Sequence, residues 1–338
     1  TAFIIAELTN TPYIDICIAA ALPAFLYYFS LSWAIDFEAA KTDLKGLPKE
    51  ELPPLWKTFI NGVYYLLPLI AIVWLLFKGY SPMKTGLYSI IMIILIAAFV
   101  SMRKKVKDIS LEKVINAMED AAKTAVSVAV ACGAAGIVVG VVSLTGLGLK
   151  FTSLIISLSG GSLVVALILT MLTSLVLGMG LPTVAAYIIQ VALIVPALIK
   201  LGVPVVPAHL FIFFYAIIAN ITPPVALAAY AGAGIAGADP MKTGFTAWKI
   251  ALTAFIVPFM FVFCPPLLLI GTPLKILQTL LTSSVGVICL AGCVEGWLFC
   301  HANVIERAML FAAALLLIES GSVTDLFGIA LVVITLIS

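Results

Sequence analysis

Charged residues are scarce in this sequence of 338 residues: they make up 10% of the chain, whereas 63% of it is apolar. Soluble domains carry charge on about a quarter of their residues, and a soluble fold has no means of hiding so much apolar surface. A bilayer hides it, because lipid replaces water around the outside of the protein. The near-zero net charge of +2 argues against a nucleic-acid partner. The composition therefore predicts an all-α polytopic membrane protein whose surroundings are the lipid bilayer.

The sequence also lacks the residue patterns of metal sites and of common enzymes. Its six cysteines lie in apolar stretches without a CxxC pair, so we expect packing thiols rather than metal ligands or disulfides. The histidines are His209 and His301, and we expect neither to be functional. A GxxxxGK[ST] loop for ATP and a GxSxG nucleophile elbow are both absent from the sequence. These absences argue against an enzyme, and we expect neither a catalytic residue nor a cofactor nor a metal centre.

Apolar runs predict several spanning helices, each of which needs roughly 20 apolar residues. The predicted spans are 13–35, 59–77, 85–101, 124–145, 208–235, 249–270, 283–299 and 308–335. Between 145 and 208 a longer apolar stretch is interrupted by Gly and Pro. It predicts a loop that contains Gly160 and Gly161, followed by a helical hairpin over 162–200 with its tip at 178–183. Both ends of such a hairpin lie on one side of the membrane.

Two polar segments, 36–58 and 102–123, interrupt the apolar pattern. The second begins with a basic cluster and continues with the run Ser110–Lys123, whose apolar residues recur at helical spacing. We interpret it as an amphipathic arm on the membrane surface, with an ordinary solvated loop as the alternative. Its basic residues place it in the cytoplasm by the positive-inside rule; they are Arg103, Lys104, Lys105 and Lys107.

The centre of the chain has no carboxylate: from Thr124 to Ala238 the sequence contains neither Asp nor Glu. The charged side chains there are those of Lys150 and Lys200, both at predicted helix ends where they reach water. A proton pump is expected to carry buried carboxylates in its core. The acidic and basic residues in and between the last two spans are expected to be interface or pairing charges; they are Glu295, Glu306, Arg307, Glu319 and Asp325.

Instead of charge, this centre contains two predicted helix breaks. One is the sequence LGMGLPT over Leu177–Thr183, and the other is NITPP over Asn220–Pro224. A double proline removes two N–H donors and clashes with the preceding turn, so carbonyls near Ile218, Ala219 and Asn220 are predicted to be free. In hydrocarbon such groups need a partner, and discontinuous helices of this kind are typical of transporter binding sites.

The two breaks together offer groups that can bind a cation and an anion. Free carbonyls and the hydroxyls of Thr183 and Thr222 suit a hard cation such as Na⁺, while helices that begin at Thr183 and Val225 offer free N–H groups to an anion. The alternative is that both are ordinary kinks, because Gly and Pro are frequent in membrane helices. The occurrence of two breaks with small polar neighbours in a core without carboxylates favours the functional interpretation.

Several motifs resemble the fused membrane permease subunit of the tripartite ATP-independent periplasmic (TRAP) transporters. The two core motifs are LGMGLPTVAAY, at Leu177–Tyr187, and NITPPVALAAYAGAGIAGADP, at Asn220–Pro240. Similar but less specific stretches are GLPKEELPP at Gly46–Pro54, Gly79–Pro82, Glu295–Trp297 and Asp325–Gly328.

The resemblance implies an elevator-type transporter with inverted repeats, a re-entrant helical hairpin and a broken transmembrane helix. It implies that a periplasmic solute-binding protein delivers a small organic acid, that Na⁺ drives uptake by symport, and that the chain lies in the cell inner (cytoplasmic) membrane. Carried over by motif, the sodium ligands are main-chain groups of Gly178, Ala219, Thr222 and Val225. The family often has Gly at the position of Ala219. The residues expected to contact the substrate are Gly180, Pro182, Thr183, Asn220 and Pro223.

On this interpretation the chain divides into five parts. They are the end of the first repeat (1–35), a polar connecting loop (36–58), scaffold helices with the arm (59–123), the second-repeat transport core (124–270) and C-terminal helices (271–338). Because Thr1–Glu7 looks like the end of the first repeat's broken helix, we expect the first hairpin and the small-subunit helices to lie upstream, outside this sequence.

Two other hypotheses compete with a TRAP-type permease. The second hypothesis is another elevator transporter, for dicarboxylates or similar anions, that works without a binding protein; the arm, the loop 36–58 and the tail favour the TRAP-type permease over it. A membrane-embedded enzyme is the third hypothesis, but it needs a nucleophile with a base, or a metal cluster, in the apolar core, and the sequence contains neither there.

Overall fold

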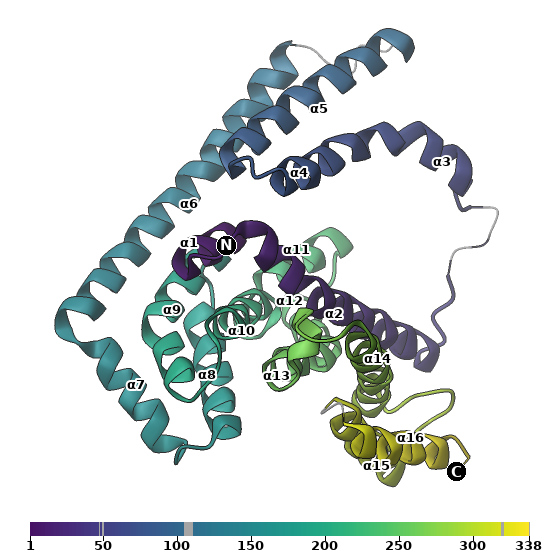
Figure 1. Cartoon of the computed structure of the whole chain (residues 1–338). Helices are drawn as coiled ribbons and strands as arrows, with labels where there is room; N and C mark the ends of the chain where they lie inside the picture. The colour runs from purple at the N-terminus through teal and green to yellow at the C-terminus, as the bar shows by residue number, and fades with distance from the viewer. Residues whose placement is uncertain (47, 49–50, 105–110, 319–320, 338) are drawn as a thin grey trace. The chain divides into compact units, whose positions relative to one another are not determined.

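The chain is mainly helical in the part that the computed structural model describes, which comprises residues 1–46, 48, 51–104, 111–318 and 321–337. The one β-type pairing within these ranges is an isolated bridge between Trp297 and His301. The helices, drawn in Figure 1, are α1 (Ala2–Thr9), α2 (Tyr13–Lys41), α3 (Leu55–Gly62), α4 (Leu67–Phe77), α5 (Pro82–Lys104), α6 (Leu111–Thr145), α7 (Leu147–Leu158), α8 (Leu163–Gly178), α9 (Thr183–Lys200), α10 (Val205–Ile218), α11 (Leu227–Ala236), α12 (Pro240–Ala251), α13 (Val257–Phe263), α14 (Pro273–Glu295), α15 (Val304–Ile318) and α16 (Ser322–Ile337).

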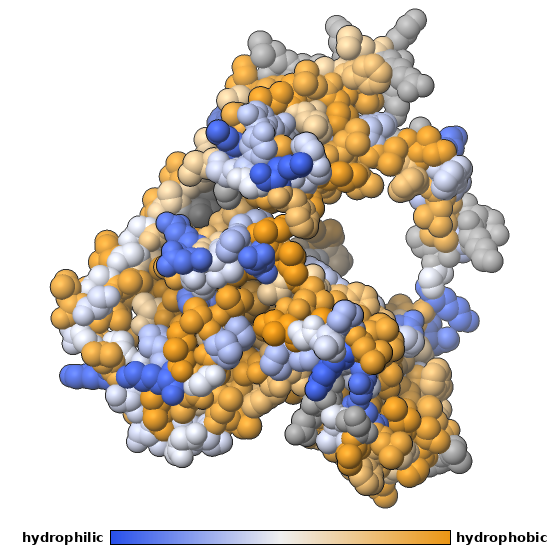
Figure 2. Space-filling model, in the orientation of Figure 1, coloured by the Kyte–Doolittle hydropathy of each residue, from blue (hydrophilic) through white to orange (hydrophobic). Residues whose placement is uncertain are grey.

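Short 3₁₀ segments continue several of these helices; they are η1 (Val63–Leu66), η2 (Ala219–Ile221), η3 (Leu252–Ile256) and η4 (Pro265–Leu268). Within the described ranges, five helices are long and apolar enough to cross a membrane, and a sixth span results if the pair 132–145 and 147–158, bent by 78°, counts as one. Apolar residues cover most of the face seen in Figure 2. The chain is therefore an all-α, multi-pass membrane protein, as its composition predicts.

The chain forms two compact units. The first consists of Thr1–Thr11, Asp15–Leu44 and Val130–Ser338, and the second of Pro12–Ile14 and Lys45–Ala129. In the second unit, α4 and α5 pack against each other. The first unit contains both predicted helix breaks and the hydrophobic core.

Helix α10 lies at the centre of the first unit. Ten of its residues are buried, including Phe211, Phe214 and Tyr215, and it packs against α8, α9 and α13. The Tyr215 hydroxyl donates a hydrogen bond to the Phe255 carbonyl at 2.6 Å, which ties α10 to η3. Apolar side chains thus surround α10, and its C-terminal end carries the second helix break.

Several boundaries predicted from hydropathy differ in the structure. Residues 147–158 form helix α7 where a loop is predicted, and the turn after it is made by residues 159–161, in which Gly160 and Gly161 have positive φ. Helix α2 continues to Lys41, past the span end predicted at residue 35, and both Glu38 and Lys41 have partners on other helices. The predicted span 308–335 is two helices, α15 and α16, which pack against each other.

The predicted arm is described only in part. Lys105, Lys107 and Ser110 lie outside the described residues, as does Glu319 among the tail charges. From Leu111 the run is helical and continues without interruption into the span that ends at Thr145. Two residues of the predicted apolar face, Ile115 and Met118, are 53% and 68% exposed. That the arm lies on the cytoplasmic surface remains a prediction.

The hairpin formed by α8 and α9 leads to a prediction about membrane topology. Its two helices pack against each other and join through four residues, 179–182, with no polar loop between them. We therefore expect cysteines introduced at Leu163 and Ile199 to react with a membrane-impermeant thiol reagent from the same side of the membrane. Labelling of the two positions from opposite sides would show that the hairpin is two full crossings. The control is the chain with its exposed Cys300 replaced by Ser.

Candidate ion and solute site

The hairpin tip begins where α8 ends at the buried Gly178. The next residues turn through Gly180, which has φ of +73°, a conformation that glycine adopts without steric cost. Pro182 is the N-cap of α9 and Thr183 is its first residue. A proline immediately before a helix has no N–H to leave unbonded, and it fixes φ near the helical value. The break predicted at 178–183 thus coincides with the interruption between α8 and α9.

The second break lies between α10 and α11. Helix α10 ends at Ile218, η2 covers Ala219–Ile221, and α11 begins at Leu227. Thr222 is extended, with φ of −100° and ψ of 123°, as expected for a residue that precedes proline. The sequence predicts a helix start at Val225, and the structure moves it two residues later. Val225 instead lies in the linking segment, where its carbonyl accepts a hydrogen bond from the Leu227 amide at 3.1 Å.

The tip and the second break touch each other at three places. A Cβ atom on Gly178 would lie 2.8 Å from the Ala219 Cβ, and one on Gly180 would lie 3.5 Å from the Val225 Cγ1. The Asn220 side-chain amide donates to the Thr183 hydroxyl at 3.3 Å. The structure therefore brings together six of the nine predicted site residues, which come from segments about 40 positions apart in the chain.

The remaining three predicted residues take other positions. Pro182 is exposed at the tip. The Thr222 hydroxyl donates to the Ile218 carbonyl at 2.9 Å, so it bonds within its own segment. Pro223 faces α12, since a Cβ on Gly244 would lie 3.9 Å from the Pro223 Cγ.

The main-chain carbonyls at the two breaks are only partly engaged. Gly178 accepts from the Leu181 amide at 3.4 Å and Ala219 from the Thr222 amide at 3.3 Å, both at or beyond the long end of the usual range. The prediction of a free Ile218 carbonyl is wrong, because the Thr222 hydroxyl bonds to it. A carbonyl has two lone pairs, so Gly178, Ala219 and Val225 each retain acceptor capacity. A hydroxyl that donates its proton also keeps its lone pairs, and the Thr222 oxygen remains a possible cation ligand.

The first turn of α9 offers hydrogen-bond donors at the same place. No side chain of the described residues caps this helix, although its first N–H groups have no partner within the helix. The partial positive charge of a helix N-terminus attracts anions. The charged side chains of Lys150 and Lys200 lie at other helix ends and are exposed there. The tip and the break thus combine neutral oxygens with free N–H groups in a region without carboxylates.

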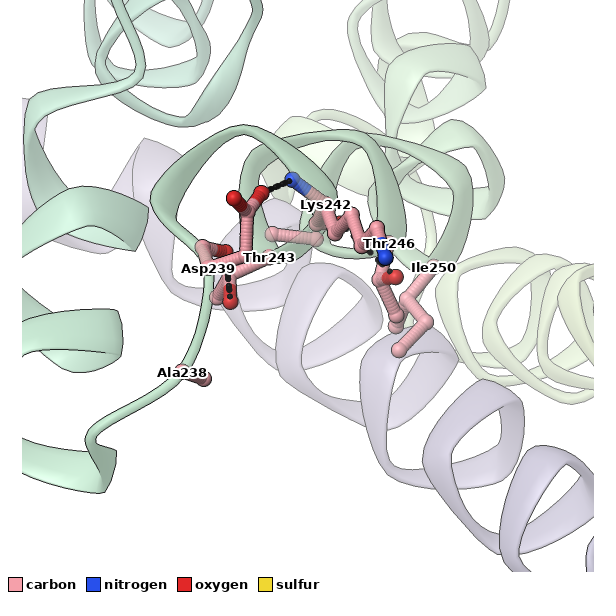
Figure 3. A pocket seen from close by; sticks show the side chains of 7 residues that line it. Ala238, Asp239, Lys242, Thr243, Thr246 and Ile250 are labelled. Carbon is pink, nitrogen blue, oxygen red and sulfur yellow. Dashed lines mark hydrogen bonds between the residues drawn. The ribbon is translucent and has the colours of Figure 1, made fainter.

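A surface hollow of about 460 Å³ lies nearby in the sequence but is a different place. It is lined by α12 and the residues before it (Figure 3): Ala238, Asp239, Lys242, Thr243, Thr246, Ala247 and Ile250. The Asp239 carboxylate accepts a hydrogen bond from the Lys242 amide at 2.8 Å, which caps α12 in the usual manner of an Asp before a Pro. None of the predicted site residues lines this hollow.

A network of four charged side chains joins α2, α12 and α14, and only one of the four was predicted from the sequence to pair. Glu295 was expected to pair, and its side chain is fully buried with the Lys249 ammonium 2.5 Å from its Oε2. Lys249 also lies 3.0 Å from the Glu38 Oε2. The Lys41 ammonium donates to the Glu295 carbonyl at 2.9 Å. Two carboxylates and two ammonium groups therefore balance one another, and this explains why α2 extends to Lys41.

His209, for which no functional role is predicted, has a hydrogen-bond partner in the structure. Its Nδ1 lies 2.6 Å from the Tyr187 hydroxyl, and both side chains are buried. Gln190, which the sequence analysis did not single out, is also fully buried on α9. Gln190 could have been identified from the sequence as the isolated amide in the apolar run IIQVALIV, because polar residues inside membrane helices are often functional.

A model of a known protein family matches most of the chain. Residues 1–276 match the family described as "Tripartite ATP-independent periplasmic transporter, DctM component". The matched part includes both helix breaks and ends within the first residues of α14. No curated protein and no solved structure matches the chain.

The contact between Gly178 and Ala219 predicts a rescue experiment. We expect Gly178→Ala to impair transport, because its Cβ would lie 2.8 Å from that of Ala219. Gly178→Val, with its bulkier and stiffer side chain, should be more severe. Adding Ala219→Gly should restore much of the activity of Gly178→Ala, since it removes the opposing methyl group. Initial uptake rates measure the effect, and a double variant no better than Gly178→Ala would show that this contact does not limit the tip.

The charged network predicts a loss of stability when Lys249 is removed. We expect Lys249→Met to destabilise the protein by about 3 kcal/mol, the low end for breaking a buried pair, because Lys249 is partly exposed and screened by solvent. Thermal unfolding in detergent measures the change. Lys249→Arg, which keeps the charge, is the matched control. Adding Glu295→Gln to Lys249→Met should recover stability, and no recovery would contradict the assignment of Lys249 as the partner of the buried carboxylate.

Proposed function

Since this chain belongs to the family of DctM components of tripartite ATP-independent periplasmic transporters, we propose that it is the permease of a sodium-driven uptake system for a small organic acid anion. The family match supports secondary transport of organic acids by a multi-pass membrane protein, rather than an enzyme. Coupling to Na⁺, delivery of the solute by a periplasmic solute-binding protein, and location in the inner (cytoplasmic) membrane are our proposals.

The observation that carries the proposal is the contact between the hairpin tip and the second helix break. Gly178 adjoins Ala219, Gly180 adjoins Val225, and Thr183 is bonded to Asn220. A cation held there has no carboxylate to neutralise it, so dipoles must do so. We propose that main-chain groups of Gly178, Ala219, Thr222 and Val225 hold Na⁺, with the Thr222 hydroxyl as an additional oxygen ligand.

The same contact explains how an anionic solute binds beside the ion. The N–H groups at the start of α9 point away from their own helix, toward the tip. We propose that Gly180, Pro182, Thr183, Asn220 and Pro223 form this half of the solute site. Bound Na⁺ would partly offset the negative charge of the solute, so that each ligand favours the binding of the other.

Coupling then follows from the difference in ion affinity between two states of the tip. A ligand shifts a conformational equilibrium only by its differential affinity for the two states. Na⁺ binds tightly when the tip lies against the second break, because both segments contribute ligands. We propose that this closed state carries ion and solute across the membrane together by an elevator movement of the core.

Transport in proteoliposomes tests the function. We expect the intact permease to take up organic acids only when its solute-binding protein is present, and only down an inward Na⁺ gradient. Uptake driven equally well by a proton gradient would exclude sodium coupling. Full transport by the permease alone would instead favour an elevator-type dicarboxylate or anion transporter that needs no binding protein.

Pro223→Ala refines the test, because alanine returns an N–H and lets the helix close over its own carbonyls. We expect a weaker apparent affinity for Na⁺. At the neighbouring position, Thr222→Val should weaken the Na⁺ affinity more than Thr222→Ser, which keeps the hydroxyl and is the matched control for Thr222→Val. An unchanged Na⁺ affinity in Pro223→Ala would contradict the proposed ion site.

A further inference from the structure

A buried glutamine lies directly behind the hairpin tip. Gln190 is on α9, its side chain is fully buried, and its Nε2 donates to the Ser174 carbonyl on α8 at 3.0 Å. The same Nε2 would lie 3.3 Å from a Cβ on Gly178, which in turn would lie 2.8 Å from the Ala219 Cβ. The amide of Gln190 therefore adjoins the point where the tip meets the second helix break.

The hydrogen bond to Ser174 leaves the amide oxygen available. With Nε2 fixed on the Ser174 carbonyl, Gln190 presents Oε1, and this buried atom has no hydrogen-bond partner among the described residues. An amide oxygen is an acceptor with two lone pairs and no proton to donate. It needs a donor or a cation as its partner.

Ser174, whose carbonyl accepts the hydrogen bond from Gln190, has a second oxygen in its hydroxyl group. Its Oγ is likewise buried and unpartnered in the described structure. Helical Ser and Thr hydroxyls commonly bond to the carbonyl four residues earlier, as Thr173 does on the same helix at 2.8 Å. Ser174 does not make this bond, so its oxygen is available to a ligand.

We propose that Gln190, assisted by Ser174, supplies side-chain oxygen ligands to the coupling cation at the hairpin tip. The inference rests on the proposed function, because it extends the main-chain ion site by two neutral side-chain oxygens. Hard cations take oxygen ligands and prefer several of them. A neutral amide suits a monovalent cation here, since Oε1 adds a strong dipole without a charge that would trap the ion.

Three variants of the intact permease test the assignment. Gln190→Leu removes the amide and should weaken the apparent affinity for Na⁺ by about tenfold, as expected when one ligand to a charged group is lost. Ser174→Ala removes one hydroxyl with little change of shape and should weaken it by about threefold. Thr170→Val is the matched control: its hydroxyl is also buried and unpartnered, but it lies one turn further from the tip, and the affinity should stay the same.

The measurements are the half-saturating Na⁺ and Li⁺ concentrations in proteoliposome uptake and, independently, the thermal stabilisation of detergent-solubilised protein by each ion. Loss of a side-chain ligand should change the ratio of Li⁺ to Na⁺ affinity. A merely structural role would lower the transport rate and leave this ratio unchanged, which would overturn the inference. Ser174→Ala decides the matter if Gln190→Leu fails to fold.

Two further outcomes separate this inference from the function on which it rests. If the unaltered permease responds to Na⁺ while Gln190→Leu and Ser174→Ala both match it within roughly twofold, a change too small for a lost ligand, only the assignment of Gln190 and Ser174 fails. If the unaltered permease responds to no monovalent cation in either measurement, the sodium site and its side-chain ligands fail together.

Discussion

The close approach of Gly178 to Ala219 is the contact on which the proposed site depends. A hydrogen atom in place of a side chain lets the end of α8 reach η2, and the two helix interruptions then share one space. In an apolar environment each interrupted helix must find partners for its unbonded main-chain groups. Because the interruptions meet, they offer carbonyls and amides to the same ligand. Unbonded groups that would destabilise two separate helix ends can thus form the binding site that we propose when the ends are adjacent.

Four charged residues take no part in this contact and interact with one another instead. Glu38, Lys41, Lys249 and Glu295 join α2, α12 and α14 into a network whose formal charges sum to zero. Charge in an apolar region is tolerated when it is paired and hydrogen-bonded. The residues that meet at the hairpin tip are neutral, so the cation that we propose there would be held by dipoles and not by a full charge.

The sequence predicted the fold class and the two helix interruptions because both have strong local causes. Apolar composition indicates a membrane protein, and Gly178, Gly180 and the pair Pro223–Pro224 end helices by known steric effects. The predictions from sequence failed where the structure depends on packing between segments that are distant in the chain. The extension of α2 to Lys41 depends on Lys249 and Glu295, which are distant in sequence. Helix α7 and the break between α15 and α16 lie within long, mainly apolar stretches of the sequence, and hydropathy averaged over such a stretch does not locate the ends of helices. Gln190 was overlooked because its position behind Gly178 depends on how α8 and α9 pack.

The shortness of the helices around α10 has a consequence for how the protein enters the membrane. Helices α8, α10 and α11 have 16, 14 and 10 residues, fewer than the roughly 20 needed to cross the hydrocarbon. None of them can partition into lipid as an independent stable span, since its unbonded ends would lie in hydrocarbon. These segments must therefore remain with the translocation machinery, or with one another, until α9 and α10 have packed. The interruptions that form the proposed binding site are thus expected to delay the membrane insertion of the region that contains them.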